Sequence, residues 1–354
     1  MKIVLAGGGT AGHIEPALNL ADELKLRHPD AQIVMLGTER GLETTLVPSR
    51  GYPLELIEAT PLPRKLNVDL LSLPIRLRGA IKQCKAVLQD ANVLVGFGGY
   101  VSLPAYLAAR GEVPIVIHEA NARPGLANRV GAKFANVVAE TVAGTLPQAI
   151  QTGIPLRRAL VDFDRTALGN EAHNHFGIPP GATVLLVFGG SQGAAKLNDV
   201  MNQARLAGAF ADVHVIHAVG AKNDLPTNLD ANYHAVHYLD RMDLAYAIAD
   251  FVICRSGAVT VAEITAVGLP ACYVPLPVGN GEQTLNARAV TSAGGGIIVP
   301  DAQFSREFVT ETVVPLLHDQ GRRESMATIS AQFGHRGASS ALADLVDNVL
   351  RERS

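Results

Sequence analysis

The stretch VLAGGGTAGHIEP, residues 4–16, decides how the chain begins to fold. An apolar run leads into glycines at Gly7, Gly9 and Gly12, and a helical pattern follows them. This spacing is typical of a strand, a tight turn and a helix whose N-terminus binds a phosphate in dinucleotide-binding domains. A lone G-x-G-x-x-G is a weak signal, so the rest of the chain has to show what faces this turn.

Length and composition predict two globular domains. The chain has 354 residues, 48% of them apolar, and so exceeds the size at which one hydrophobic core usually stops growing. The formal net charge is only −3, aromatic residues are scarce and Trp is absent, so nothing indicates a broad basic surface or an aromatic stacking surface. We therefore expect no nucleic acid among the partners.

Cysteine usage and hydropathy predict a compartment. Cys84, Cys254 and Cys272 are far apart and lack C-x-x-C spacing, which argues against a disulfide framework and against a zinc site. The sequence starts in a strand without signal-peptide features, and no apolar window approaches a membrane span. We expect a protein of the reduced cytosol, at most peripheral to a membrane.

Short apolar runs without alternation, separated by amphipathic stretches, predict strands buried on both faces of a parallel sheet. Each run leads into a helical pattern, which favours an α/β fold wound from βα units. The runs are KIVLAG, QIVMLGT, NVLVGFGG, PIVIHE and NVVAE in the first half, and TVLLVFGG, VHVIHAVG, HAVHYL, FVICRS, ACYVPLP and GIIVP in the second.

A coarse repeat divides the chain. A strand, a Gly-Gly pair, a polar residue and a helix occur at Gly8 and again at Gly189, about half a chain apart. A Gly and Pro pair with irregular sequence at 152–160 marks the break. We predict two Rossmann-like parallel-sheet domains, 1–156 and 157–335, with an amphipathic helix within 336–354 returning to the first.

A dehydrogenase is one interpretation of the opening motif. It requires a single nucleotide fold and an acidic residue at the end of the second strand, where Glu39 is a poor match. It also leaves the second glycine cluster, VFGGSQGA at 187–194, unexplained. The opening motif alone therefore does not favour hydride transfer.

The second half holds three helix starts, each suited to a polar ligand because a helix N-terminus offers unpaired N–H groups. In GGSQGAAKLN, Ser191 is predicted to cap the helix and bond a phosphate oxygen; in CRSGAVTVAE, Ser256 is the predicted N-cap. Glu263 follows about two turns later and could accept both hydroxyls of a ribose, or be an ordinary solvated helix acid. The third start carries Glu282, Gln283 and Asn286. Together these starts predict a pocket for a nucleotide diphosphate bearing a hydroxyl-rich group.

Six motifs in order cover nearly the whole chain: GGTAGHIEPALNLADEL, GFGGYVSLPA, HEAN, GGSQGA, CRSGAVTVAE and EQTLNA. Together they resemble the MurG family of peptidoglycan glycosyltransferases. The resemblance implies the GT-B architecture, with two Rossmann-like domains around a deep cleft, UDP-sugar in the second and a lipid-linked acceptor in the first.

The reaction implied by the resemblance is an inverting, metal-independent transfer that needs no cofactor. N-acetylglucosamine moves from UDP-N-acetylglucosamine to the 4-hydroxyl of the muramoyl sugar of undecaprenyl-pyrophosphoryl-MurNAc-pentapeptide, which converts lipid I to lipid II. Such an enzyme serves peptidoglycan synthesis, and through it cell shape and division, at the cytoplasmic face of the bacterial plasma membrane.

The resemblance also assigns ligand contacts by position. Thr10, Ala11 and Gly12 line the donor sugar, and Asn121 contacts the same region; Arg157 and Ser191 hold the diphosphate; Leu239 and Met242 flank the uracil; Ala258, Val259, Thr260 and Glu263 bind nucleotide and ribose; Gln283 addresses the sugar hydroxyls.

His13 is the expected general base. It lies at a helix N-terminus, where the dipole disfavours imidazolium and keeps a neutral, proton-accepting ring. An isolated histidine here would more often cap or pack, and the family motif reverses that preference. By the helix-start argument, Gly98, Gly99 and Tyr100 suit the pyrophosphate of the acceptor.

Two positions depart from the family pattern, and one motif is misleading. Ala11 replaces a glycine and restricts positive φ, and Glu282 replaces a glutamine, which leaves Gln283 as the safer sugar contact. The Asp-x-Asp at 162–164 matches a metal-binding motif, but it follows the predicted linker, so we expect a solvated helix start and no metal.

Residues 61–88 carry six basic residues against one acid, Asp69. Interleaved leucines and Ile75 could enter the headgroup region of an anionic inner leaflet, or the segment could be a helix packed on its own sheet; Pro74 argues against one long helix. The basic residues are Arg64, Lys65, Arg76, Arg78, Lys82 and Lys85, and the leucines are Leu66, Leu70, Leu71, Leu73 and Leu77.

Other function classes stay open on the sequence alone. A related GT-B enzyme, such as a UDP-sugar 2-epimerase or a glycosyltransferase for other lipids, would share the fold. An NAD-dependent oxidoreductase or a non-catalytic nucleotide-binding module is supported only by the opening fingerprint.

Overall fold

The computed structural model describes residues 1–39, 41–60 and 69–352, with the backbone alone for 69–72. The chain forms two compact units: Met1–Arg157 with Arg336–Ser354, here the N-terminal unit, and Arg158–His335, here the C-terminal unit. The α/β class with two parallel sheets is confirmed.

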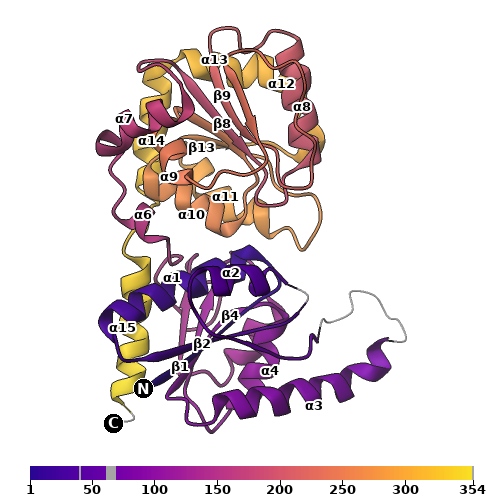
Figure 1. Cartoon of the computed structure of the whole chain (residues 1–354), viewed down its shortest axis with the longest axis vertical. Helices are drawn as coiled ribbons and strands as arrows, with labels where there is room; N and C mark the ends of the chain where they lie inside the picture. Colours follow the sequence, from indigo (N-terminus) through magenta and orange to yellow (C-terminus); the bar gives the residue numbers. More distant parts are fainter. Residues whose placement is uncertain (40, 61–68, 353–354) are drawn as a thin grey trace. The chain divides into compact units, whose positions relative to one another are not determined.

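The N-terminal unit is built on a seven-stranded parallel sheet with strand order β3-β2-β1-β4-β5-β6-β7 (Figure 1). The order reverses between β1 and β4, so the loops after these two strands diverge to opposite faces and leave a crevice at the carboxyl edge. The strands are β1 (Lys2–Gly7), β2 (Gln32–Gly37), β3 (Leu54–Leu56), β4 (Val93–Gly98), β5 (Ile115–Glu119), β6 (Val137–Glu140) and β7 (Ile150–Gln151).

The C-terminal unit repeats this plan with six parallel strands in the order β10-β9-β8-β11-β12-β13. Its order reverses between β8 and β11, where Cys254 pairs with Phe188 at the strand ends. The strands are β8 (Val184–Phe188), β9 (His214–Ala218), β10 (Tyr233–Val236), β11 (Phe251–Cys254), β12 (Ala271–Tyr273) and β13 (Gly296–Ile298).

Every strand expected from an apolar run is present, and the two unexpected strands are β3 and β7. These edge strands have only three and two residues, and most of their side chains are exposed. Strands this short and this exposed need no run of apolar residues, and such a run is what predicts the central strands from the sequence.

Helices cover both faces of the N-terminal sheet. Along β1, Ile3 and Leu5 pack into one core with residues of α1 and α15, whereas Val4 and Ala6 pack into a second core with residues of α3 and α4. This alternation is the period-two pattern of a strand buried on both sides. The helices are α1 (Ala11–Arg27), α2 (Glu43–Ser49), α3 (Asp69–Leu88), α4 (Gly99–Ala109), α5 (Leu126–Gly131) and α15 (Ala338–Arg351).

Helices also flank the C-terminal sheet, where Leu185 and Val187 of β8 pack with Leu197 and Met201 of α8 in one core. Asp164 accepts hydrogen bonds from the N–H groups of Thr166 and Ala167, which confirms that the Asp-x-Asp motif starts a helix. The helices are α6 (Arg158–Val161), α7 (Arg165–Phe176), α8 (Ala195–Leu206), α9 (Met242–Ile248), α10 (Ala258–Val267), α11 (Glu282–Ser292), η1 (Asp301–Gln303), α12 (Arg306–Phe308), η2 (Val309–Val313), α13 (Val314–His318) and α14 (Gln320–Ala331).

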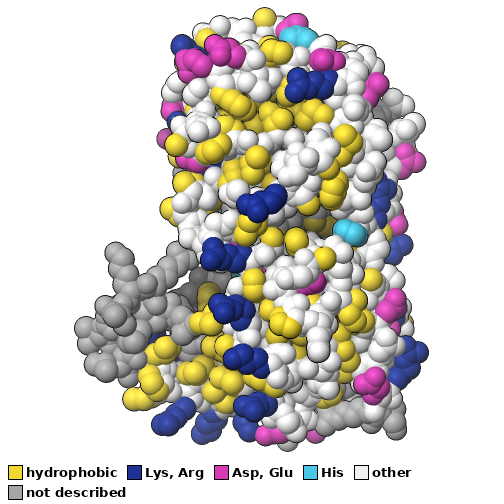
Figure 2. Space-filling view, turned by 180° about the vertical axis from the view of Figure 1, so that it is seen from behind, with side chains coloured by type: hydrophobic (Ala, Val, Ile, Leu, Met, Phe, Trp, Pro, Cys, Tyr) yellow, Lys and Arg dark blue, Asp and Glu magenta, His cyan; other side chains and the backbone are white. Residues whose placement is uncertain are grey.

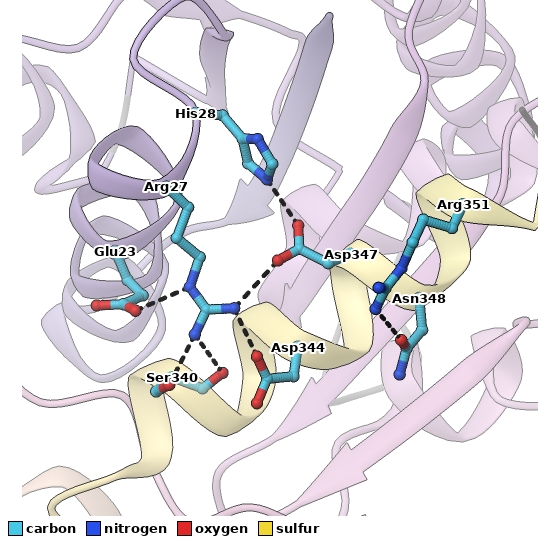
Figure 3. Close-up of polar contacts among 8 residues, drawn as sticks. All are labelled: Glu23, Arg27, His28, Ser340, Asp344, Asp347, Asn348 and Arg351. Atoms are coloured by element: carbon cyan, nitrogen blue, oxygen red, sulfur yellow. Dashed lines mark hydrogen bonds and ion pairs between the residues drawn. The ribbon is translucent and has the colours of Figure 1, made fainter.

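The last helix, α15, packs on α1 through an ionic cluster (Figure 3). Arg27 donates to Asp344 Oδ1 at 2.6 Å, to Asp347 Oδ2 at 3.0 Å and to Ser340 Oγ at 2.6 Å. His28 Nε2 lies 2.7 Å from the other oxygen of Asp347. Because one guanidinium joins three side chains of α15, this helix is fixed to the N-terminal unit.

Helix α3 runs through Pro74, which lies in its second turn and does not end it. The expected interruption is therefore wrong. Proline lacks an N–H, so it removes one hydrogen bond of the helix here without ending it, and the chain stays helical from there to Leu88.

The three cysteines are all buried and free. Within the described ranges, no helix is long and apolar enough to cross a membrane.

Candidate active site

The two glycine-rich loops of the N-terminal unit meet at the switch point between β1 and β4. A side-chain carbon at Gly99 would lie 2.4 Å from the Gly8 carbonyl oxygen, and Gly99 has a φ of +79°, so only glycine allows this approach. A carbon at Gly98 would lie 3.4 Å from His13 Cδ2. The starts of α1 and α4 therefore face one small region that holds His13.

His13 lies in the first turn of α1, and its Nδ1 is 3.1 Å from Thr10 Oγ1. Burial lowers the pKa of His13 to about 4, so the ring is neutral at pH 7. Ala11 is the first residue of α1 and is not among the residues with positive φ, so an alanine fits there without strain. A side-chain carbon at Gly12 would meet only Thr10 Oγ1, at 3.7 Å, among the described residues.

Glu119, at the end of β5, organises the loop that contains Asn121. Its Oε1 accepts the Asn121 N–H at 3.0 Å, and its Oε2 accepts the Gly125 N–H at 3.0 Å and Asn128 Nδ2 at 2.9 Å. Burial raises the pKa of Glu119, and these hydrogen bonds oppose the rise. Asn128 also accepts from Tyr106 Oη at 2.7 Å, so the HEAN motif is connected to α4.

Tyr100 and Arg157 are held by neighbours within the N-terminal unit. Tyr100 Oη lies 3.2 Å from Thr38 Oγ1, which ties the second glycine loop to the end of β2. Arg157 Nη2 donates to Glu15 Oε1 of α1 at 2.7 Å. Arg157 therefore lies in the unit that contains His13, whereas Ser191 lies in the other unit.

In the C-terminal unit, the loops after β8 and β11 emerge side by side at the switch point. A carbon at Gly193 would lie 1.9 Å from the Val219 carbonyl oxygen, so the loop that carries Ser191 is pressed against the end of β9. The first helical bond of α10 runs from the Val261 N–H to the Gly257 carbonyl at 3.0 Å. The N–H groups of residues 258–260 precede this bond and have no acceptor within the helix, so they can donate to a ligand.

Two capping predictions are wrong. The N-cap of α8 is Ala194 and not Ser191, because the loop makes an extra turn, from the Gly193 N–H to the Gly190 carbonyl, before the helix starts. The N-cap of α10 is Gly257 and not Ser256, because the chain stays extended for one more residue. Ser256 is buried, and its Oγ has no hydrogen-bond partner among the described residues.

The other predicted donor contacts lie on α9, α10 and α11 and in the loop before α9. Tyr246 Oη of α9 donates to Glu263 Oε2 at 3.0 Å. Gln283 Oε1 accepts the Leu276 N–H at 3.0 Å, and Glu282 Oε2 accepts the Asn280 N–H at 3.1 Å, so Glu282 shapes its own loop. Leu239 is buried, and Met242 begins α9.

Sequence reasoning missed Glu43, Asn128 and Tyr246, each of which contacts a predicted site residue or its loop. The sequence around each of them does not predict its role, because its partner is 34, 9 or 17 residues away and hydrophobic periodicity does not predict such contacts. Glu119 could have been found, since a polar residue that closes a buried parallel strand lies at the ligand-binding edge.

Three histidines predict an acid-sensitive fold. Burial lowers the pKa of His13, His118 and His217 to about 4 each, against an ordinary value of 6.5 in the unfolded chain. The unfolded state therefore binds more protons between pH 6.5 and 4, and stability falls as pH falls through this window, by up to about 1.4 kcal/mol per pH unit for each histidine.

Urea unfolding at pH 7.5 and pH 5.0 measures this effect. We expect a lower midpoint at pH 5.0, and a smaller pH dependence in His217→Gln than in the exposed control His175→Gln. Equal midpoints at both pH values in the wild-type protein would show that these rings are not neutral in the folded state.

The matching family models and the named sequence relatives agree on one family. Residues 3–140 match the glycosyltransferase family 28 N-terminal domain, and residues 184–342 match its C-terminal domain. The chain is 56% identical, over 99% of its length and 96% of the relative, to the UDP-N-acetylglucosamine–N-acetylmuramyl-(pentapeptide) pyrophosphoryl-undecaprenol N-acetylglucosamine transferase of Mycobacterium sp. (strain KMS).

A protein of the same name from Saccharopolyspora erythraea is 55% identical over 98% of this chain and 93% of that protein. Among solved structures, MurG of Acinetobacter baumannii matches with a TM-score of 0.79 and 26% identity, over 98% of this chain and 99% of that one. Both units of the chain thus have counterparts in the same proteins.

Proposed function

The chain belongs to glycosyltransferase family 28, and on that premise we propose that it transfers N-acetylglucosamine from UDP-N-acetylglucosamine to undecaprenyl-pyrophosphoryl-MurNAc-pentapeptide. The observation that carries this proposal is 56% identity over 99% of the chain to a transferase of that name. The enzyme has the GT-B architecture and serves peptidoglycan synthesis.

The C-terminal unit is proposed to bind the donor. The N–H groups at the start of α10 and the loop around Ser191 offer hydrogen bonds to a diphosphate, and the helix dipole of α10 favours its negative charge. Glu263, which accepts a hydrogen bond from Tyr246, is proposed to accept the ribose hydroxyls. Leu239 and Met242 supply apolar surface for the uracil, and Gln283 addresses the sugar.

The N-terminal unit is proposed to supply the acceptor and the base. If Thr10 Oγ1 accepts the proton on His13 Nδ1, the lone pair on Nε2 is left to take the proton of the acceptor hydroxyl. That oxygen then forms a bond to the anomeric carbon while the bond to the UDP oxygen breaks, with inversion, and UDP leaves. The start of α4 at Gly98, Gly99 and Tyr100 is suited to the acceptor pyrophosphate.

Helix N-termini supply the positive ends that a departing diphosphate needs, so we propose that the transfer requires no metal. Within the described ranges, no group of three or more His, Cys, Asp or Glu side chains could hold a metal ion. The epimerase and oxidoreductase alternatives are disfavoured because relatives more than half identical to this chain, over nearly its whole length, are named as transferases.

Transfer of radiolabel from UDP-N-acetylglucosamine to a synthetic undecaprenyl-pyrophosphoryl-MurNAc-pentapeptide tests the function, in parallel with and without EDTA. We expect labelled lipid in both samples. A thermal-shift series with UDP and NAD runs beside it, because only a ligand of the folded state raises the melting temperature. Stabilisation by NAD without UDP, and no labelled lipid, would overturn the proposal.

Helix α3 is proposed to contact the anionic inner leaflet, which would place the enzyme at the cytoplasmic face of the membrane. Ile75 is 73% exposed, and Figure 2 shows Lys and Arg side chains beside hydrophobic ones over α3. Ala80, Cys84 and Leu88 pack into the core instead, so only part of the helix is available to lipid. The predicted contacts Arg64, Lys65 and Leu66 lie outside the described residues, as do the side chains of Leu70 and Leu71.

Two exposed cations of α3 provide a test of this contact. The double variant Arg78→Gln/Lys82→Gln should bind vesicles containing phosphatidylglycerol roughly tenfold more weakly or worse, since each basic residue near the surface contributes about 1 kcal/mol. Co-sedimentation measures the bound fraction, with the exposed pair Arg129→Gln/Lys133→Gln as the charge-matched control. Equal binding by the two double variants would argue against α3.

A further inference from the structure

Glu43 is a buried carboxylate that no motif singled out. It begins α2 and is fully buried. Its Oε1 accepts the Gly9 N–H at 2.9 Å, across 34 residues of sequence. Figure 1 shows α2 beside α1. The hydrogen bond from Gly9 to Glu43 therefore joins α2 to the glycine loop that precedes α1.

Three glycines make room for this side chain. A carbon at Gly8 would lie 2.4 Å from Glu43 Oε1, one at Gly37 would lie 2.9 Å from Glu43 Cβ, and one at Gly41 would overlap Glu43 Oε2. Each carbon would displace part of the Glu43 side chain. Part of the glycine pattern in this region therefore accommodates Glu43 and not a ligand.

The Gly9 N–H is one of the groups that a phosphate would bind in a G-x-G-x-x-G loop. Here a carboxylate of the same unit already accepts it. A second anion at this position would lose that hydrogen bond and meet a negatively charged neighbour if Glu43 is ionised. This explains how a dinucleotide fingerprint can occur in a unit whose proposed ligand is not a dinucleotide.

Tyr100 lies close against the same loop. Gly9 has a φ of +91°, and a carbon there would lie 2.5 Å from Tyr100 Cε1. Thr10 follows directly and contacts His13 Nδ1. The order of contacts therefore runs from Glu43 through Gly9 and Thr10 to the ring of His13.

Stability does not explain Glu43. Its Oε2 is buried and has no hydrogen-bond partner among the residues that the structure describes. A buried carboxylate oxygen without a partner destabilises a fold, so a residue chosen for stability alone would be apolar or neutral here.

We propose that Glu43 is a positioning residue for the transfer: its carboxylate takes the place of a phosphate on the Gly9 N–H and so fixes the loop that orients Thr10 and His13. This inference rests on the proposed function, because it assigns His13 to the reaction. Glu43 itself touches no substrate in this account.

Two variants separate the hydrogen bond from the charge. Glu43→Gln keeps an oxygen at the position of Oε1 and loses the charge, whereas Glu43→Asp keeps the charge and is one methylene too short to reach Gly9. We expect kcat within about threefold of wild type for Glu43→Gln, and about tenfold lower or worse for Glu43→Asp, with the donor KM unchanged in both. Thr44→Ala, on the same helix and exposed, is the control.

Inorganic phosphate gives a readout that a purely structural role would not change. In Glu43→Ala the Gly9 N–H is open to anions, so phosphate should inhibit this variant in competition with the acceptor and should not inhibit Glu43→Gln. Native circular dichroism and melting temperatures identify any variant that has not folded; if Glu43→Asp does not fold, Glu43→Gln and Glu43→Ala decide the outcome.

A large loss of kcat in folded Glu43→Gln, or wild-type kcat in both Glu43→Asp and Glu43→Ala, would overturn the inference. Those outcomes leave the proposed function standing, since the wild-type enzyme would still transfer the sugar. A wild-type protein that transfers no N-acetylglucosamine would instead overturn the proposed function.

Discussion

Replacing His13 with alanine is expected to lower kcat by about 10²- to 10⁴-fold while UDP binds with unchanged affinity. The base acts on the acceptor hydroxyl in the N-terminal unit, whereas the proposed UDP contacts, apart from Arg157, lie in the C-terminal unit. Labelled transfer at saturating substrates measures kcat, and calorimetry measures the affinity for UDP. His28→Ala, just past the end of the same helix, is the matched control, because His28 contacts Asp347 of α15 and not the glycine loops.

Two further results would support this assignment. Thr10→Val removes the hydroxyl that contacts His13 Nδ1, so we expect a smaller loss of kcat than in His13→Ala. Because the pKa of His13 is about 4, the ring stays neutral from pH 7 to pH 5, and its protonation should not reduce kcat/KM in that range. Unchanged kcat in His13→Ala would remove it from the role of base.

Replacing Glu263 with alanine is expected to raise the donor KM roughly a hundredfold, with a much smaller change in kcat at saturating donor. The carboxylate is proposed to accept two ribose hydroxyls, and a hydrogen bond to a charged group contributes about 1.5–3 kcal/mol. Initial rates over a range of UDP-N-acetylglucosamine concentrations separate the two constants.

Tyr246→Phe tests whether the position of the Glu263 carboxylate matters. It removes the hydroxyl that donates to Glu263 Oε2 and keeps the ring in the core, so we expect a smaller rise in donor KM in the same direction. Glu171→Ala, an exposed acid that pairs with Arg241, is the control for lost charge. An unchanged affinity for UDP in Glu263→Ala would exclude the ribose contact.

The sequence predicts the centre of each sheet better than its edges. Strands such as β4 and β8 are apolar because every one of their side chains is buried, and this leaves a continuous signal. The edge strands β3 and β7 bury too little to leave one. The fold class depends on the buried strands, so the sequence predicts it even though the sequence does not predict the edge strands.

The sequence also predicts some site residues and not others. The glycine loops and the start of α10 follow directly after predicted strands, so topology places them at the ligand-binding edge. The caps at Ser191 and Ser256 could not be placed correctly, because one extra turn or one extended residue moves a helix start without a change in composition. Glu43 and Tyr246 act through contacts 34 and 17 residues away in the sequence, which only the folded chain reveals.

The C-terminal unit is proposed to bind the activated sugar and the N-terminal unit to present the acceptor. Hydrogen–deuterium exchange with and without UDP, which lacks the sugar that Thr10, Ala11 and Gly12 are predicted to line, tests this division most directly. We predict slower exchange in the peptides covering 189–194 and 256–263, and little change at 7–13. Protection at 7–13 with none in the C-terminal unit would contradict the account.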